Sequence, residues 1–131
     1  MVYAGANWCT LLANCIMSNH VHAILGIGDW PVSIGAEAED FELDKKVTPT
    51  EFPLTSALGS IKKYTARRAN RILGRSGAFW QEETFDHLIR NGEELKRAAW
   101  YTLLNPVKAG MCHDWEDWPW TYCPPWLRER L

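Results

Sequence analysis

The chain has no uninterrupted run of about 18 apolar residues, the length that points to a transmembrane helix. Its first residues lack the basic start, apolar core and small-residue cleavage site of a secretory signal peptide. The four cysteines form neither a CxxC pair nor a zinc-ribbon spacing. We therefore expect a cytoplasmic protein without membrane contact, whose cysteines are free thiols.

Acidic residues are missing from one stretch of the chain and crowded into another. Residues 62–75 hold six basic residues and no acid, whereas residues 37–51 hold six acids and two lysines. The net charge of −2 hides this segregation. Solubility alone does not require such a run of one sign, so residues 62–75 indicate a local phosphate-binding surface rather than an ordinary solvated helix face.

The length of 131 residues predicts one domain over 1–131. Residues 11–25 alternate in polarity and predict a strand with one apolar face, which includes Cys15 and Val21, and one mixed face, which carries His20 and His22. Residues 26–53 are rich in glycine, proline and acids and predict a loop or insertion. Residues 77–90 predict a turn and then a strand. The tail, residues 106–131, is rich in tryptophan and proline and predicts a flap over the sheet or a helix.

Residues 55–73 predict a helix that carries most of the basic run. Its apolar stripe includes Leu58, Ile61 and Ile72, and Gly74 after it suits a left-handed stop. The candidate contacts to a DNA backbone are the cations on and just beyond this helix: Lys62, Lys63, Arg67, Arg71 and Arg75.

A second helix is predicted over 92–105, and Pro106 is expected to end it. Asn91 as N-cap and Glu94 three residues later form a capping box at its start. Tyr101 and Asn105 stand four residues apart, which places them on one face, about 6 Å apart along the helix axis.

His20 and His22 stand two residues apart in the predicted strand, so both side chains project from the same face. Each neutral imidazole offers one lone pair, and the two rings could therefore hold a metal ion. The alternative interpretation is a pair of ordinary half-buried histidines, and the spacing alone leaves both open. A metal site built from Cys112, His113 and Cys123 is a further alternative.

Metal-assisted cleavage of a phosphodiester needs a cation on the phosphate, an in-line nucleophile and cationic side chains that hold the strand. His20 and His22 could supply imidazole ligands, and Asn105 an amide oxygen. Tyr101, one helical turn before Asn105, is the candidate nucleophile. A phenol is weakly nucleophilic at neutral pH, and a cation at the phosphate would favour its attack. Tyr64 is the other candidate, but no ligand-type residue accompanies it.

The segment MSNHVHAIL resembles the histidine–hydrophobic–histidine motif of the HUH single-tyrosine transposases. The segments IKKYTARRANRILGR, GAFWQEETFDHLIR, WYTLLNPVKAGM and WPW follow in the order found in the REP-associated branch of that family, the RAYT proteins. The first motif alone is unspecific, whereas several motifs in the family's order are specific. The resemblance covers residues 14–26 and 57–121.

This resemblance implies an α+β fold, namely a ferredoxin-like α/β sandwich with an antiparallel sheet. It implies that His20, His22 and Asn105 bind Mg²⁺ or Mn²⁺. It also implies that Tyr101 attacks single-stranded DNA, forming a 5′-phosphotyrosine and freeing a 3′-hydroxyl. The implied partners are palindromic repeats that fold into hairpins, with a short guide sequence beside the stem. The implied location is the nucleoid of a prokaryotic cytoplasm, and a monomer and a homodimer both stay open.

The chain departs from the family's pattern in several places. Ser18 stands where relatives often have proline, and the loop over 26–53 looks longer than usual. Few residues precede the histidine strand, whereas relatives carry a first strand and a first helix there. The resemblance therefore implies an N-terminally truncated fold, for which we expect poor solubility or self-association and weak cleavage.

Two other classes of function stay open at this point. A non-catalytic DNA-binding remnant of such a transposase would keep the basic helix and lose cleavage. A small zinc protein would use His20, His22 and a cysteine. Metal analysis separates these classes, because one tightly held equivalent of zinc favours the zinc protein, and exchangeable Mg²⁺ or Mn²⁺ favours the transposase.

Overall fold

The computed structural model describes residues 9–27 and 52–131. The described residues form two compact units, one of residues 9–27 and 89–131 and the other of residues 52–88. A division into compact units does not decide how many domains the chain has, because one domain can contain two such units. The single domain over 1–131 therefore stays a prediction. The predicted loop over 26–53 lies outside the described residues, apart from its two ends, which belong to a strand and a helix.

The histidine segment forms a β-hairpin, so the prediction of one strand over 11–25 is wrong. Two antiparallel strands form the hairpin: β1 (Cys9–Ile16) and β2 (Val21–Ile27). The Met17 N–H donates to the His20 carbonyl oxygen across the turn, at 2.9 Å. Ser18 and Asn19 occupy the turn, and such residues favour turns because their side chains can bond nearby backbone groups.

The register of the hairpin places His22 on its buried face. Cys15 pairs with His22 and Ala13 pairs with Ile24, so these four side chains lie on one face of the sheet. Cys15, Ala13 and Ile24 are buried, whereas Val21 is exposed. The sequence-based prediction placed His22 on the other face, away from Cys15. It continued the alternation of one strand through residues 17–20, whereas the chain reverses there and the faces of the second strand are exchanged.

The tail adds regular structure to this unit, where only a flap was predicted. β3 (Thr121–Tyr122) pairs antiparallel with β1, which gives the strand order β2-β1-β3. A short 3-10 helix, η1 (Trp115–Asp117), precedes it, and α4 (Pro125–Arg128) follows it. Pro125 stands at the first position of α4, where the N–H that proline lacks is not needed.

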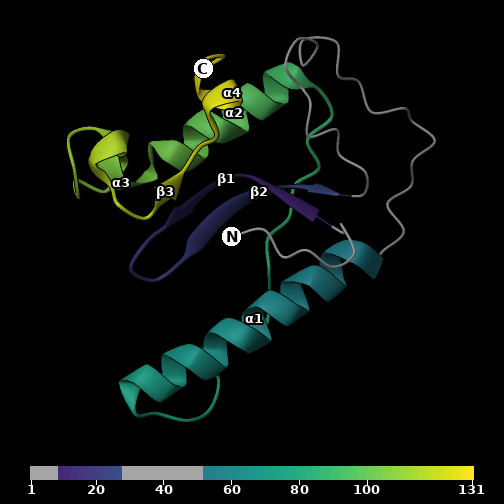
Figure 1. The fold of residues 1–131 in the computed structure, drawn as a ribbon, viewed down its shortest axis with the longest axis vertical. Coiled ribbons are helices and arrows are strands. Elements are labelled where there is room, and N and C mark those ends of the chain that lie inside the picture. Colours follow the sequence, from purple (N-terminus) through teal and green to yellow (C-terminus); the bar gives the residue numbers. More distant parts are fainter. Residues whose placement is uncertain (1–8, 28–51) are drawn as a thin grey trace. The chain divides into compact units, whose positions relative to one another are not determined.

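α2 (Gly92–Leu103) lies along one face of the hairpin, with α4 beside it (Figure 1). Asn91 caps α2 as predicted, and its Oδ1 accepts from the Glu94 N–H at 2.9 Å. The Glu94 carboxylate accepts from the Arg90 N–H instead of the N–H of the cap residue. The core joins both strands, α2 and α4 through six buried residues: Leu12, Ala13, Ile24, Leu95, Ala99 and Leu127. The antiparallel sheet and its helices confirm the α+β class.

α2 ends before the predicted boundary at residue 105, but a further helix follows almost at once. Leu104 keeps a right-handed helical conformation, and α3 (Asn105–Lys108) begins after it. The Lys108 N–H donates to the Leu104 carbonyl at 2.9 Å, so the backbone stays helical through the junction. Pro106 does not end the helical path, because it occupies the first turn of α3, where proline is tolerated.

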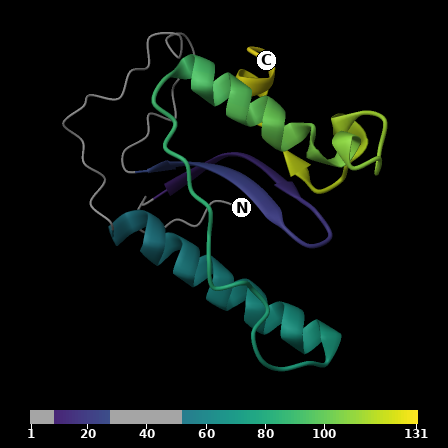
Figure 2. The same ribbon diagram turned by 180° about the vertical axis from the view of Figure 1, so that it is seen from behind.

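The second unit consists of α1 (Phe52–Leu73) and the strap, which we define as residues 75–84. Gly74, with φ of 61°, ends α1 in the left-handed conformation, and the strap turns back beside the helix (Figure 2). Three side chains of α1 bond the strap: Asn70 to the Gly77 carbonyl, Thr65 to the Trp80 indole N–H, and Lys62 to both the Gln81 carbonyl and the Thr84 hydroxyl. The strand predicted within 77–90 is wrong, because no residue of this described segment is in a strand and side chains of α1 bond its polar groups instead.

From the sequence we also expect that no helix spans a membrane and that the cysteines are free thiols. Among the described residues, no helix combines the length and the apolar character that crossing a membrane requires. Cys15, Cys112 and Cys123 are free, as expected. Burial raises the pKa of the Cys15 thiol, which keeps it protonated and unreactive.

Candidate functional site

The predicted nucleophile and the predicted metal ligands all belong to the first unit. His20 directly precedes β2, and His22 is the second residue of that strand. Tyr101 lies in the last turn of α2, and Asn105 is the first residue of α3. The hairpin and α2 share one core, and this packing brings residues distant in sequence to one place.

The two histidine rings face each other edge to face. Their centroids lie 5.0 Å apart, and the ring planes make an angle of 84°. His20 Nδ1 lies 2.7 Å from Asn19 Oδ1, and an amide oxygen can only accept, so Nδ1 carries the proton. The lone pair of His20 is then on Nε2, the nitrogen that stays available to a metal ion.

His22 is less exposed than His20, and its protonation reflects this. Burial lowers the pKa of His22, and the nearby charge of His20 lowers it further. Both effects favour the neutral imidazole, which is the form that can donate a lone pair to a metal.

Tyr101 contacts His22 directly. The two ring centroids are 5.4 Å apart, and the planes make an angle of 85°. Tyr101 is nevertheless 57% exposed, so a substrate can approach this residue. The structure thus brings together two residues that are 79 positions apart in the sequence (101 − 22 = 79).

Asn105 is positioned by Tyr101 through the backbone. Its Nδ2 donates to the Tyr101 carbonyl oxygen at 3.2 Å, the bond expected for a side chain one helical turn later. With the amide nitrogen used in this way, Oδ1 remains the free acceptor of the side chain. The predicted role of Asn105 as an oxygen ligand is therefore compatible with how its amide is held.

Lys108 is a site residue that the sequence interpretation missed. Its ammonium nitrogen lies 5.0 Å from the centroid of the Tyr101 ring. The helical path was expected to stop at Pro106, which would have removed Lys108 from the site. Its spacing of seven residues from Tyr101, close to two helical turns, was the signal that could have identified it.

The donor set fits a divalent cation that keeps water or phosphate ligands. Two imidazoles and one amide oxygen leave several coordination positions open, and Mn²⁺ accepts nitrogen ligands more readily than Mg²⁺ does. Among the described residues, no group of three or more His, Cys, Asp and Glu side chains could hold a metal. This finding opposes the alternatives that combine Cys112, His113 and Cys123, or His20 and His22 with a described cysteine.

The five predicted DNA contacts divide into two groups on the second unit. Lys62 and Arg75 donate to groups of the strap, Arg75 through the Ala78 carbonyl at 3.1 Å. Three cations have no bonding partner among the described residues, and we call them the basic stripe: Lys63, Arg67 and Arg71. They are spaced four residues apart and therefore follow one side of α1.

One comparison with known proteins identifies a relative. Over 110 residues, the chain is 26% identical to a protein of Haemophilus influenzae (strain ATCC 51907 / DSM 11121 / KW20 / Rd). That protein bears the provisional name REP-associated tyrosine transposase. The match covers 84% of this chain and 56% of the relative, so this chain spans little more than half of the relative's length. The similarity supports a transposase and agrees with the family that the motifs suggest.

The two other comparisons identify nothing further. No family model matches the chain, and no solved structure matches it.

Proposed function

We propose that this chain is a transposase domain of the HUH single-tyrosine type, which cleaves and rejoins single-stranded DNA. The observation that carries the proposal is the contact of the His22 and Tyr101 rings at 5.4 Å, with Asn105 one turn further along the same helical path. A nucleophile beside candidate metal ligands is the arrangement that phosphodiester cleavage requires. The name of the Haemophilus relative supports the same class.

In the proposed reaction, the Tyr101 hydroxyl oxygen attacks the phosphorus atom of a phosphodiester. The new bond joins this oxygen to phosphorus, and the bond from phosphorus to the 3′-oxygen breaks. The phenolic proton is released to solvent, and the leaving 3′-oxygen takes up a proton. Tyr101 then carries the 5′-phosphate, and attack by a 3′-hydroxyl on this linkage restores a phosphodiester and frees the tyrosine.

His20, His22 and Asn105 would hold Mg²⁺ or Mn²⁺. When bound, the ion would supply positive charge at the scissile phosphate. The residues themselves hold the geometry: Asn19 orients the His20 ring, and the Tyr101 carbonyl orients the Asn105 amide. Lys108, with its ammonium beside the Tyr101 ring, adds a positive charge where the phosphate would approach.

We propose that the basic stripe of Lys63, Arg67 and Arg71 binds the DNA backbone. Successive stripe residues rise about 6 Å along the helix, so each can meet a different phosphate of an extended strand. Lys62 and Arg75 hold the strap in this proposal. The DNA would be a palindromic repeat in hairpin form, as the resemblance to the REP-associated branch implies.

The experiment that tests this function uses labelled hairpin DNA with a single-stranded flank, together with Mn²⁺. Denaturing electrophoresis should show a protein–DNA adduct that forms in Mn²⁺ and disappears in excess chelator. Binding without any adduct would instead indicate a non-catalytic DNA-binding protein, and tightly bound zinc in the purified protein would indicate the zinc protein.

A further inference from the structure

The tail forms a hollow of ≈ 270 Å³ on the first unit, which the proposed chemistry does not use. This volume lies just below the range of about 300–1,000 Å³ typical of small-molecule pockets. Three aromatic rings and an ion pair contribute to its lining: Trp115, Trp118, Tyr122, Glu116 and Arg128. The hollow therefore suits one flat ring system with polar edges rather than a large ligand.

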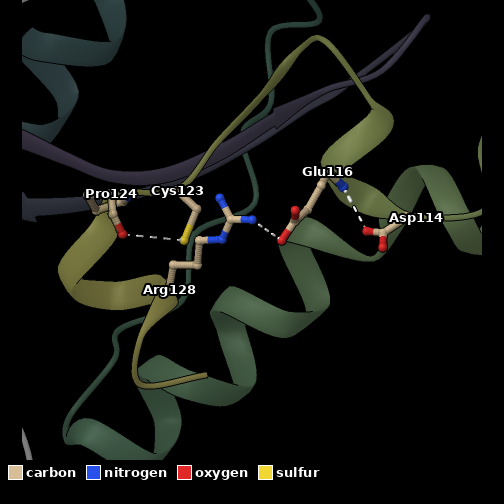
Figure 3. Close-up of polar contacts among 5 residues, drawn as sticks. All are labelled: Asp114, Glu116, Cys123, Pro124 and Arg128. Atoms are coloured by element: carbon tan, nitrogen blue, oxygen red, sulfur yellow. Dashed lines mark hydrogen bonds and ion pairs between the residues drawn. The ribbon is translucent and has the colours of Figure 1, made fainter.

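The walls of the hollow are held in place by specific contacts. Figure 3 shows the Arg128 guanidinium directed at the Glu116 carboxylate, with which it forms an ion pair. The same guanidinium lies over the Trp115 ring, 5.5 Å from its centroid. The Asp114 carboxylate accepts from the Glu116 N–H at 3.0 Å and caps η1, which fixes the start of this segment (Figure 3).

The hollow is tied to the strand that leads into the histidine turn. The Trp118 indole N–H donates to the Ile16 carbonyl oxygen at 2.9 Å, and the Ile16 N–H donates to the Trp120 carbonyl oxygen at 2.9 Å. Ile16 ends β1 and pairs with Val21, the residue between His20 and His22. The hollow and the histidine turn are therefore both held by the end of β1, which is the structural connection between the hollow and DNA at the proposed active site.

We propose that this hollow binds one unpaired base of the single-stranded DNA, next to the phosphate that Tyr101 attacks. The position of the bound base, next to Tyr101, rests on the proposed function. The binding of a base in the hollow does not depend on it. Aromatic side chains bind unpaired bases by stacking, and a guanidinium over an indole extends such a platform. Asp114, Glu116 and Asp117 are acidic and repel phosphate, so the hollow favours a neutral base over the backbone.

The Glu116 carboxylate also determines which bases fit. An ionised carboxylate only accepts hydrogen bonds, and it therefore pairs with the amino groups of adenine, cytosine and guanine. Thymine has no amino group, and its N3–H donor lies between two carbonyl oxygens, which repel a carboxylate. Cytosine and thymine have similar size and stacking surface, so a preference for cytosine over thymine isolates the contribution of Glu116.

The test is equilibrium binding of short fluorescent oligo(dC) and oligo(dT) of equal length. It uses the Tyr101→Phe protein in chelator, which separates binding from cleavage. We expect oligo(dC) to bind about tenfold more tightly or better, the effect of one hydrogen bond to a charged group. Glu116→Gln should remove this preference, and Trp115→Leu should weaken both oligonucleotides about fivefold or more through lost stacking.

Trp120→Leu is the matched control, because Trp120 belongs to the same tail and is exposed but does not line the hollow. It should leave both affinities unchanged. Circular dichroism checks that each variant folds, and Trp115→Phe, which keeps a ring, should fall between wild type and Trp115→Leu. Equal binding of the two oligonucleotides, or equal effects of the Trp115 and Trp120 variants, would overturn the proposal.

These outcomes are separable from those for the proposed function. A base preference that depends on Glu116, in a protein that forms no adduct with hairpin DNA, would support the hollow and reject the nuclease. An adduct formed by a protein without base preference would support the nuclease and reject the hollow.

Discussion

Tyr101 is restrained by two neighbours although more than half of the residue is exposed. The His22 ring contacts it edge to face, and the Lys108 ammonium lies beside the ring, 5.0 Å from its centroid. Both contacts limit how the ring can turn, whereas 57% of the residue is exposed to solvent. A nucleophile held in this way needs little reorganisation before attack, which is a large part of catalysis by positioning.

Replacing His22 tests the metal site. His22→Ala removes one imidazole ligand and the ring contact with Tyr101. We expect adduct formation in Mn²⁺ to fall by about 100-fold or more, because removing a group that only orients a metal ligand already costs about 10–100-fold. The measurement is the initial rate of adduct formation. His113→Ala is the control, since His113 lies on the exposed tail of the same unit, and a comparable loss there would exclude a specific role for His22.

Replacing Lys108 tests the charge beside the nucleophile. Lys108→Gln should slow adduct formation about two- to fivefold, the size of an exposed cation–π interaction, and Lys108→Arg should restore most of the rate. Lys96→Gln removes a lysine that pairs with Glu93 on the same unit, and it should leave the rate unchanged. Equal rates for the Lys108→Gln variant and the wild type would show that the ammonium has no part in the reaction.

For individual site residues, the sequence predicts contacts between residues close in the chain but misses contacts that depend on the fold. The spacing of Tyr101 and Asn105 follows from helical periodicity, and the structure shows the expected contact between them. The contact of His22 with Tyr101 depends on a hairpin that packs on α2, which no local pattern contains. Lys108 was missed because Pro106 was read as a stop, although proline is accepted in a first helical turn.

The β-hairpin shows why an alternation of polar and apolar residues can give a wrong prediction of secondary-structure elements. A turn of two polar residues fits inside an alternating pattern without disturbing it, so one strand and a hairpin have similar signatures. The hairpin reverses the chain and exchanges the faces of its second strand. His22 therefore faces α2, and this reversal is what brings it to Tyr101. The helices were better predicted, because their caps at Asn91 and Gly74 are local signals.

The division of cations on α1 gives a prediction with an internal control. Lys63→Gln/Arg67→Gln removes two charges from the basic stripe, and it should flatten the slope of log K against log salt by about 1.4–1.8. Lys62→Gln/Arg75→Gln removes the same charge from side chains that bond the strap, and the slope should change much less. The measurement is hairpin binding across a salt series. Equal changes of the slope in both double variants would mean that the basic stripe binds DNA no more strongly than the cations that bond the strap.

The hairpin carries apolar side chains on an exposed face of the sheet. Leu11, Ile16 and Val21 are 39%, 43% and 40% exposed, and Ile16 is paired directly with Val21. β2 is also an edge of the sheet formed by the described strands. Exposed apolar faces and open edges both favour association with other chains.

We therefore predict that this chain self-associates through the exposed face. Ile16→Thr/Val21→Thr keeps residues that favour strands but lowers the apolar area, and it should reduce the concentration-dependent increase in mass seen by light scattering. Phe85→Ser is the control, because Phe85 is 96% exposed but lies outside this face, in the other unit. A wild-type chain that stays monomeric at all concentrations would contradict the prediction.

We propose that Tyr101 becomes covalently linked to the 5′-phosphate of cleaved DNA. The most direct test uses hairpin DNA labelled on either side of the cleavage point, with wild type, Tyr101→Phe and Tyr64→Phe as a matched control. We predict that wild type and Tyr64→Phe retain only the fragment on the 3′ side and release a fragment ending in a 3′-hydroxyl, and that Tyr101→Phe forms no adduct. An adduct that survives in Tyr101→Phe, or one that retains the opposite fragment, would contradict this proposal.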